Sequence, residues 1–136
     1  MNEPFRAVLL KAVEVSNPVI ILIGATKRGK EIAPRLAAAL GVGCMTDCSR
    51  IEYIDGEIVV ERLTYGGSTI AKETCSSKPT IITVQSKSFE TLERREKTGT
   101  IIPLKVVIPE AKVKILERLE KTKSNQNLEN AEIIIS

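Results

Sequence analysis

The feature that most constrains this chain is an unbroken run of aliphatic and β-branched residues, PVIILIG, at positions 18–24. A strand with one solvated face alternates apolar and polar residues, whereas a strand covered on both faces is apolar throughout. The run therefore predicts an interior strand of a parallel sheet, centred on residues 19–23. Parallel strands need helical crossover connections, so the expected fold class is α/β.

Helical periodicity flanks this run on both sides. Residues 4–16 place apolar side chains three and four positions apart, and Asn17-Pro18 should end that helix. Downstream, KEIAPRLAAALG at positions 30–41 has the same spacing and ends in a glycine suited to a C-terminal cap. Because proline is tolerated only in the first turn of a helix, Pro34 predicts a start near Gly29 or Lys30.

From residue 50 the pattern changes to alternation of apolar and polar residues. Asp55-Gly56 is a strong hairpin signal, and Gly66-Gly67 marks a second break. These features predict an antiparallel meander. The apolar run PTIITVQ at positions 79–85 is expected to rejoin the parallel sheet.

The last third of the chain gives weaker signals. Residues 101–108 are predicted to form a strand, and VKILERLEK at 113–121 suits a strand or a helix, with the strand favoured. KTKSNQNLEN at 121–130 has the composition of a linker, and AEIIIS ends the sequence in the middle of an apolar run. We therefore expect one domain over 1–123, and over 124–136 a linker with the start of a following strand. A central strand near residue 20 also leads us to expect further strands upstream.

Composition excludes several functional classes. The 136 residues are 43% hydrophobic, enough for one core, and no apolar run approaches the roughly 20 residues of a membrane span. The N-terminus lacks the pattern of a secretory signal, so a cytoplasmic protein is expected. The formal charge is +3 with both signs interspersed, which does not predict nucleic-acid binding. There is no histidine, which removes every His-dependent catalytic arrangement.

The three cysteines do not predict a disulfide or a metal site. Their number is odd, and the expected compartment keeps thiols reduced. Cys44 and Cys48 could share an ion, but Cys75 supplies at most one more ligand, and Asp47 would be an unusual fourth. We therefore predict that the cysteines are small, buried side chains.

The most specific local motif is Gly24-Ala-Thr-Lys-Arg-Gly29-Lys30, which follows a predicted strand and opens a predicted helix. It approaches the phosphate-binding loop G-x-x-x-x-G-K-[ST], but Glu31 replaces the hydroxyl that would hold magnesium. Two interpretations remain open: an anion or nucleotide site formed by backbone N–H groups beside two cations, or a solvated turn. The candidate binding residues are Gly24, Thr26, Lys27, Arg28 and Gly29.

The stretch GATKRGKEIAPRLAAALGVGCMTDCSRIE, at positions 24–52, resembles the alpha subunit of electron transfer flavoprotein, in the later part of its N-terminal domain. The tail LENAEIIIS resembles the stretch that precedes the glycine-rich start of the family's flavin-binding domain. Further matching elements are Thr46-Asp47-Cys48, Tyr65-Gly-Gly, Lys78-Pro-Thr and Thr83-Val84.

The resemblance implies a nucleotide-hydrolase-like, Rossmann-like domain with an appended antiparallel region. It implies an electron carrier without its own catalytic site, a heterodimer with a beta subunit that takes electrons from dehydrogenases and passes them to a downstream acceptor. In that family FAD lies mainly in the alpha subunit's C-terminal domain and AMP in the beta subunit, so this segment alone is not expected to bind FAD. One departure is Tyr65-Gly66-Gly67-Ser68, where the family often has Tyr-x-Gly-Asn. The alternative function is a small nucleotide- or phosphate-binding protein that uses the Gly24 to Lys30 loop.

Overall fold

The computed structural model describes residues 3–93, 99–110, 113, 115–117 and 119. The predicted helix–strand–helix order at the start of the chain and the predicted meander are both confirmed. The elements in chain order are α1 (Glu3–Ser16), β1 (Ile20–Gly24), α2 (Lys27–Leu40), β2 (Cys44–Ile54), β3 (Glu57–Thr64), a short 3-10 turn η1 (Tyr65–Gly67), β4 (Thr69–Thr74) and β5 (Thr80–Val84).

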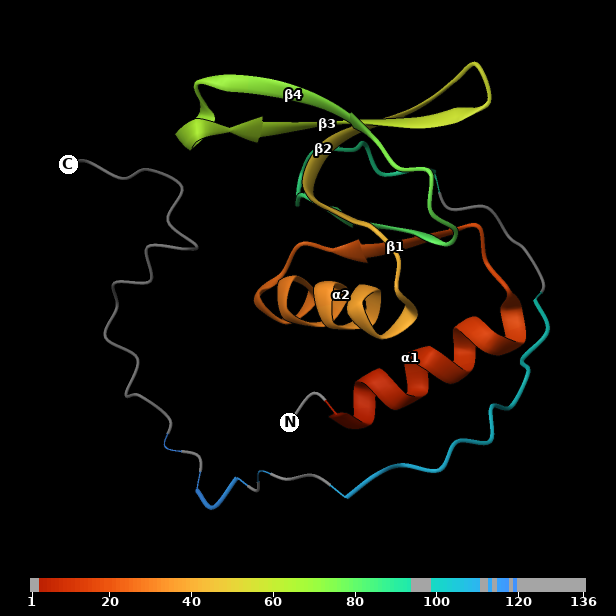
Figure 1. Cartoon of the computed structure of the whole chain (residues 1–136). Helices are drawn as coiled ribbons and strands as arrows, with labels where there is room; N and C mark the ends of the chain where they lie inside the picture. Colours follow the sequence, from red (N-terminus) through yellow and green to blue (C-terminus); the bar gives the residue numbers. More distant parts are fainter. Residues whose placement is uncertain (1–2, 94–98, 111–112, 114, 118, 120–136) are drawn as a thin grey trace.

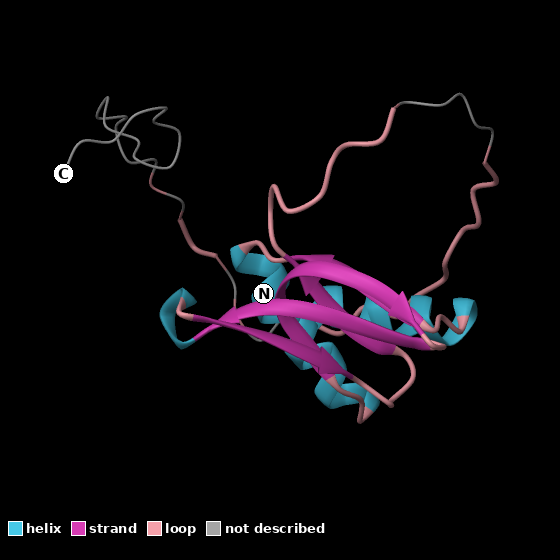
Figure 2. Ribbon diagram, turned by 90° about the horizontal axis from the view of Figure 1, so that it is seen from above, coloured by secondary structure: helices cyan, strands magenta, loops and turns pink. Residues whose placement is uncertain are grey.

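The strands form one mixed sheet in the order β1-β5-β2-β3-β4. β1, β5 and β2 are parallel, whereas β2, β3 and β4 are antiparallel. Figure 1 shows both helices on one side of the parallel strands, with the antiparallel strands extending on the other side. Figure 2 shows the same sheet from above. The predicted α/β class with a Rossmann-like parallel part and an appended antiparallel region is confirmed.

The prediction that residues 19–23 form an interior strand is wrong for the described sheet. β1 pairs only with β5 and lies at the sheet margin. Ile21 and Ile23 pack against the helices, but Ile20 and Leu22 on the opposite face are 40% and 60% exposed. A uniformly apolar run indicates that both faces of a strand tend to be buried, but it does not specify which strands lie beside it.

β5 is the interior strand instead. It pairs with β1 on one side and β2 on the other, and Ile81, Ile82 and Thr83 are fully buried. Ile81 belongs to the core beneath the helices, with Ala33, Leu36 and Ala37. Ile82 belongs to the second core, with Met45, Cys48 and Val60, on the side of the antiparallel region. Successive β5 side chains therefore join two cores on opposite faces of one sheet.

The start of α2 also differs from the prediction. α2 begins at Lys27 with Thr26 as its N-cap, so Pro34 is the eighth helical residue and not part of the first turn. Pro34 lacks the N–H that would bond to the carbonyl of Lys30, and its ring lies on the exposed side of the helix. The predicted C-terminal cap is confirmed, because Gly41 adopts the left-handed conformation with φ 67°.

The two tight turns of the meander follow their sequence signals. Asp55 and Gly56 both have positive φ angles, 50° and 88°, as a two-residue hairpin turn requires. At the second turn, the Ser68 hydroxyl donates to the Tyr65 carbonyl oxygen at 2.9 Å. Ser68 thus supplies a local polar contact at the position where the family often has asparagine.

The predicted strand at 101–108 is not present. These residues belong to no strand, because no described strand pairs with them and β-propensity alone does not create the hydrogen bonds between strands. The described residues of 113–121 likewise carry no strand or helix, and residues 124–136 lie outside the described part. Within that part, neither helix has the length and apolar character needed to cross a bilayer.

Candidate functional site

The loop from Gly24 to Lys30, the Gly24–Lys30 loop, lies where β1 ends and α2 begins. Ligands of open α/β sheets bind at this end of the parallel strands. The Ala25 N–H donates to the Val84 carbonyl oxygen of β5 at 2.7 Å, and the Thr26 N–H donates to the Gly24 carbonyl oxygen at 2.8 Å. The loop is therefore held against the end of the central strand by backbone bonds.

Thr26 closes the N-terminus of α2. Its side-chain oxygen accepts a hydrogen bond from the Gly29 N–H at 3.1 Å, and its carbonyl accepts one from the Lys30 N–H at 2.9 Å. Such a cap satisfies N–H groups that would otherwise be free to bind an anion. Thr26, which the motif marked as a binding residue, thus has an internal partner.

Gly29 permits a close approach between α2 and β1. A Cβ built on Gly29 would lie 1.9 Å from the Gly24 carbonyl oxygen and 3.1 Å from the Ile23 Cγ2 atom. Gly29 is buried, whereas Gly24 is exposed and a Cβ there would meet nothing within 4 Å. The chain's own backbone thus occupies the space beside Gly29, and this space does not form a cradle for phosphate.

The cations around the loop also face the protein. The Arg28 guanidinium carbon lies 5.1 Å from the centroid of the Phe5 ring of α1. The Lys30 Nζ atom lies 2.7 Å from an Asp47 carboxylate oxygen. Lys27 also makes an interaction within the chain. Asp47 places a negative charge beside the loop, which opposes a bound phosphate.

A bulge in β2 at Thr46-Asp47-Cys48 holds this carboxylate in place. Asp47 has a φ of 56°, and the pairing of β2 with β5 shifts register between Met45 and Cys48. The Asp47 N–H donates to the Thr83 hydroxyl oxygen at 2.8 Å, and the Gln85 N–H donates to the Cys48 carbonyl oxygen at 2.9 Å. The bulge therefore aims Asp47 at Lys30 of the loop.

Sequence reasoning found the loop but missed its closing contacts. Lys30 and Asp47 are 17 positions apart, and no local pattern links them. Glu31 pairs with Arg35 at 3.0 Å, a contact that the spacing of four residues could have predicted. Arg62 was also missed, and it donates from β3 to the Thr46 hydroxyl oxygen at 2.9 Å.

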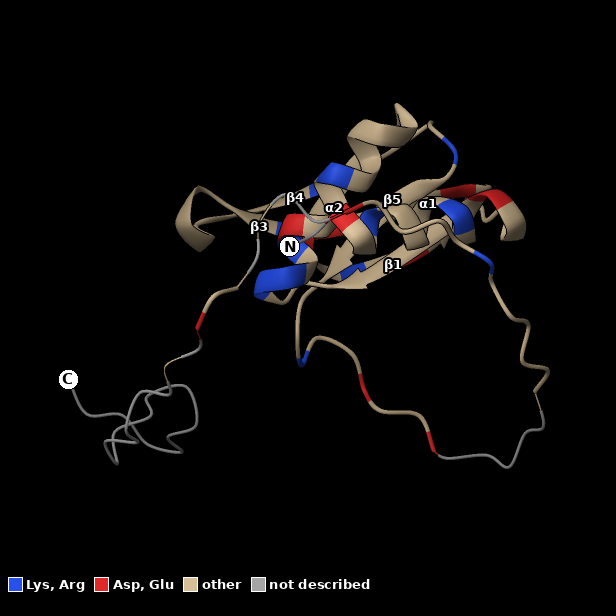
Figure 3. Ribbon diagram, turned by 90° about the horizontal axis from the view of Figure 1, so that it is seen from below, with Lys and Arg blue, Asp and Glu red and all other residues tan. Residues whose placement is uncertain are grey.

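The five predicted site residues lie together at the start of α2, and contacts within the chain already engage Thr26, Arg28 and Gly29. A phosphate site needs free N–H groups at the helix start and glycine space open to the ligand. Here Thr26 accepts from Gly29, and the Gly24 carbonyl fills the space beside it. Figure 3 shows acidic and basic residues interspersed over the described helices and strands, without a large field of one sign.

The cysteines differ in their surroundings and are all free thiols. Cys48 is fully buried, and this burial raises the pKa of its thiol to about 11. Cys44 is half-buried, and burial also raises its pKa. No group of three potential metal ligands gathers within the described residues.

Cys75 is the exception among the thiols. A hydrogen bond with the Ser77 hydroxyl, 3.1 Å from the sulfur, lowers the pKa of Cys75 below its ordinary value. The same Ser77 oxygen accepts from the Gly43 N–H at 2.7 Å. Cys75 therefore has the most ionised thiol of the three at neutral pH.

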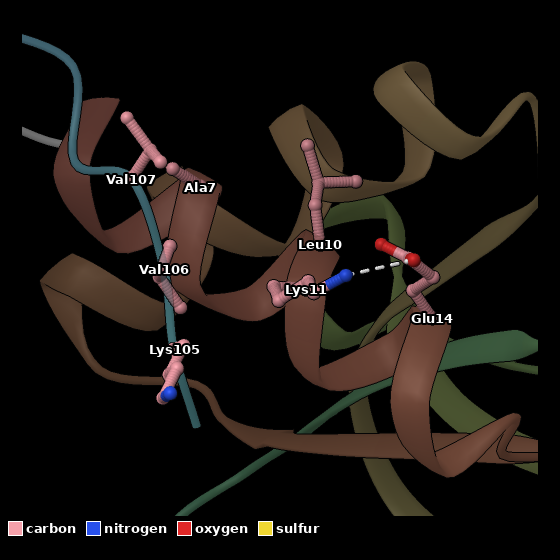
Figure 4. A pocket seen from close by; sticks show the side chains of 7 residues that line it. All are labelled: Ala7, Leu10, Lys11, Glu14, Lys105, Val106 and Val107. Carbon is pink, nitrogen blue, oxygen red and sulfur yellow. Dashed lines mark hydrogen bonds and ion pairs between the residues drawn. The ribbon is translucent and has the colours of Figure 1, made fainter. Parts of the chain in front are cut away.

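A pocket of about 490 Å³ lies outside this region, between α1 and residues 105–107 (Figure 4). Its walls are the helix residues Ala7 and Leu10, the ion pair of Lys11 with Glu14, and Lys105, Val106 and Val107. It offers few polar groups that converge on a common point, so it does not resemble a cofactor site.

The Gly29 packing gives a direct mutational prediction. Gly29→Ala should lower the free energy of unfolding by about 3 kcal/mol, because its Cβ collides with backbone that cannot move aside. Gly24→Ala is the matched control and should change it by less than about 1 kcal/mol, since its Cβ meets open space. Urea unfolding of both variants measures the difference, and equal stabilities would contradict the close approach.

The thiols should differ in reactivity. Iodoacetamide should modify Cys75 first and Cys48 last at neutral pH, because the thiolate is the reacting form. Ser77→Ala removes the hydrogen bond and should slow modification of Cys75, whereas Ser76→Ala should not. Peptide mass spectrometry over a pH series measures each rate. A faster Cys48, or a Ser77→Ala rate equal to wild type, would contradict these environments.

The sequence matches the electron transfer flavoprotein domain family over residues 1–109. It is 32% identical to protein FixB of Azorhizobium caulinodans, over 99% of this chain and 38% of that protein. It is 25% identical to electron transfer flavoprotein subunit alpha of Bacillus subtilis, over 97% of this chain and 41% of the relative. It is 30% identical to subunit LctC of a lactate dehydrogenase (NAD(+),ferredoxin) from Acetobacterium woodii, over 98% of this chain and 33% of that subunit.

The chain thus spans about two fifths of the length of FixB and of the Bacillus subunit. The match covers most of the described fold, including the Gly24–Lys30 loop and the β2 bulge at Thr46-Asp47-Cys48. These relatives favour an electron-transfer domain over a phosphate-binding protein built on the loop. The chain belongs to the electron transfer flavoprotein family and is an alpha-type domain of it.

Proposed function

We propose that this chain is the scaffold and subunit-contact part of an FAD-dependent electron carrier. In this role the whole protein takes electrons from dehydrogenases and passes them to an acceptor. The observation that carries the proposal is the family match over residues 1–109, together with relatives whose names identify electron transfer flavoprotein and dehydrogenase subunits. A beta-type subunit is the expected partner, and the cytoplasm is the expected compartment.

The proposal places FAD outside the described domain. The Gly24–Lys30 loop supports this, because the N–H groups of Ala25, Thr26, Gly29 and Lys30 bond within the chain. The space beside Gly29 is occupied by the Gly24 carbonyl, and the Lys30 charge pairs with Asp47. The domain 1–123 would support the subunit interface, and 124–136 would lead toward a flavin-binding domain. Bound FAD would supply the redox chemistry, and the residues of this domain would orient the subunits.

The same contacts weigh against the second candidate, a nucleotide-binding protein that uses Gly24, Thr26, Lys27, Arg28 and Gly29. An anion there would have to displace the Thr26 cap and compete with Asp47 for Lys30. In the proposed function these five residues hold α2 on the sheet.

Purification with its partner tests the proposed function. The whole protein that contains this chain, tagged and recovered from its source cells, should bring down a beta-type subunit and yellow material that releases FAD on denaturation. Residues 1–136 expressed alone should be colourless, because the scaffold has no flavin cradle. Absorption spectra and chromatography of the released cofactor measure both.

Two results would contradict the proposal in different ways. FAD retained by the isolated chain would overturn the scaffold role. A complex without flavin or without a beta-type subunit would overturn the electron-carrier role.

A further inference from the structure

The proposed function makes no use of the pocket between α1 and residues 105–107. The pocket has a volume of about 490 Å³, within the range of roughly 300–1,000 Å³ that is typical of small-molecule sites. Its walls come from two segments that lie far apart in the sequence, the middle of α1 and the chain after residue 104 (Figure 4). A molecule bound there would contact both segments at once.

The walls of the pocket are mainly aliphatic. Ala7, Leu10 and Val106 are half-buried, and Val107 is 94% exposed. None of the lining residues is aromatic, so the walls offer no ring on which a base or a flavin could stack. An aliphatic chain suits these walls, because it would remove the apolar surface of Leu10 and the two valines from water.

Lys105 gives the pocket its net charge. The other two charged residues in the walls, Lys11 and Glu14, pair with each other at 2.8 Å. Figure 4 shows the Lys11 amine directed along α1 toward Glu14. Lys105 is exposed and forms no ion pair with a carboxylate of the described residues. A carboxylate at the end of the aliphatic chain would supply a partner for this ammonium group.

We propose that the pocket binds an aliphatic monocarboxylate, with its chain against α1, Val106 and Val107 and its carboxylate at Lys105. The inference is independent of the proposed function, since every lining residue belongs to this chain and neither FAD nor a beta-type subunit takes part. Contact with the apolar walls supplies most of the binding free energy, and the exposed ion pair adds a smaller contribution that selects the sign of the headgroup.

A series of straight-chain ligands tests the two parts of the site. In NMR titrations of the chain with monomeric hexanoate, octanoate and decanoate, the affinity should rise about threefold for each added methylene, because each one buries apolar surface. The shifted amides should include those of Leu10, Val106 and Val107. Decyltrimethylammonium has the same chain and the charge of Lys105, so it should bind at least about fivefold more weakly than decanoate.

Two pairs of variants locate the site. Val107→Asp should weaken decanoate binding at least about tenfold, because it places a negative charge beside the chain and the carboxylate. Ile101→Asp adds the same charge at a position that is also 94% exposed but lies outside the pocket, and should change the Kd less than about twofold. Lys105→Gln should weaken binding about threefold, whereas Lys87→Gln, at an exposed lysine outside the pocket, should not.

Several results would overturn the proposal. They are no binding of decanoate at millimolar concentration, an affinity that does not change with chain length, equal effects of Val107→Asp and Ile101→Asp, and equal affinities for decanoate and decyltrimethylammonium. Binding to phosphatidylglycerol vesicles without binding of monomeric decanoate would indicate a membrane surface as the ligand and would also overturn it. None of these results bears on the electron-carrier role, which is tested by the flavin and the partner subunit.

Discussion

The structure depends on burying β5 between β1 and β2, with both faces covered. Ile81 packs in the core beneath the helices, and Ile82 packs in the core beside the antiparallel region. A single strand thus contributes to both packed layers. Burial of apolar area contributes about 25 cal/mol per Å², and the buried side chains of the parallel part are concentrated around this strand. The hydroxyl of Thr83, also buried, is satisfied at the Asp47 N–H.

The closed loop follows from this arrangement. Thr83 and Val84 anchor the β2 bulge at Thr46-Asp47-Cys48 and the start of the Gly24–Lys30 loop, so the loop at this end of the sheet is held by the protein's own contacts. The ion pair of Lys30 with Asp47 is exposed and contributes about 1 kcal/mol or less to stability, so its main effect is to occupy the cation. A domain closed in this way is suited to holding other parts of a flavoprotein in place.

Sequence alone predicted most of the local structure, since helix periodicity, the Asp55-Gly56 turn and the Gly41 cap are encoded within a few residues. It did not predict which apolar run would be interior. PVIILIG and PTIITVQ look alike, and the choice between margin and centre depends on strand order, which is a long-range property. The candidate loop was found through its glycines, but its closure depends on Asp47 and Phe5, which no local pattern connects to it. The segment 101–108 was predicted as a strand from propensity, but propensity does not supply a neighbouring strand, and no described strand pairs with it.

Both cores depend on β5. Native-state hydrogen exchange can measure this dependence, because amides in the most stable unit exchange only by global unfolding. The amides of Ile81, Ile82 and Thr83 should exchange most slowly of all described residues, with opening free energies equal to the global free energy of unfolding. The edge strands β1 and β4 should open at lower free energy. Exchange of the β5 amides as fast as those of β4 would show that the two cores do not depend on β5.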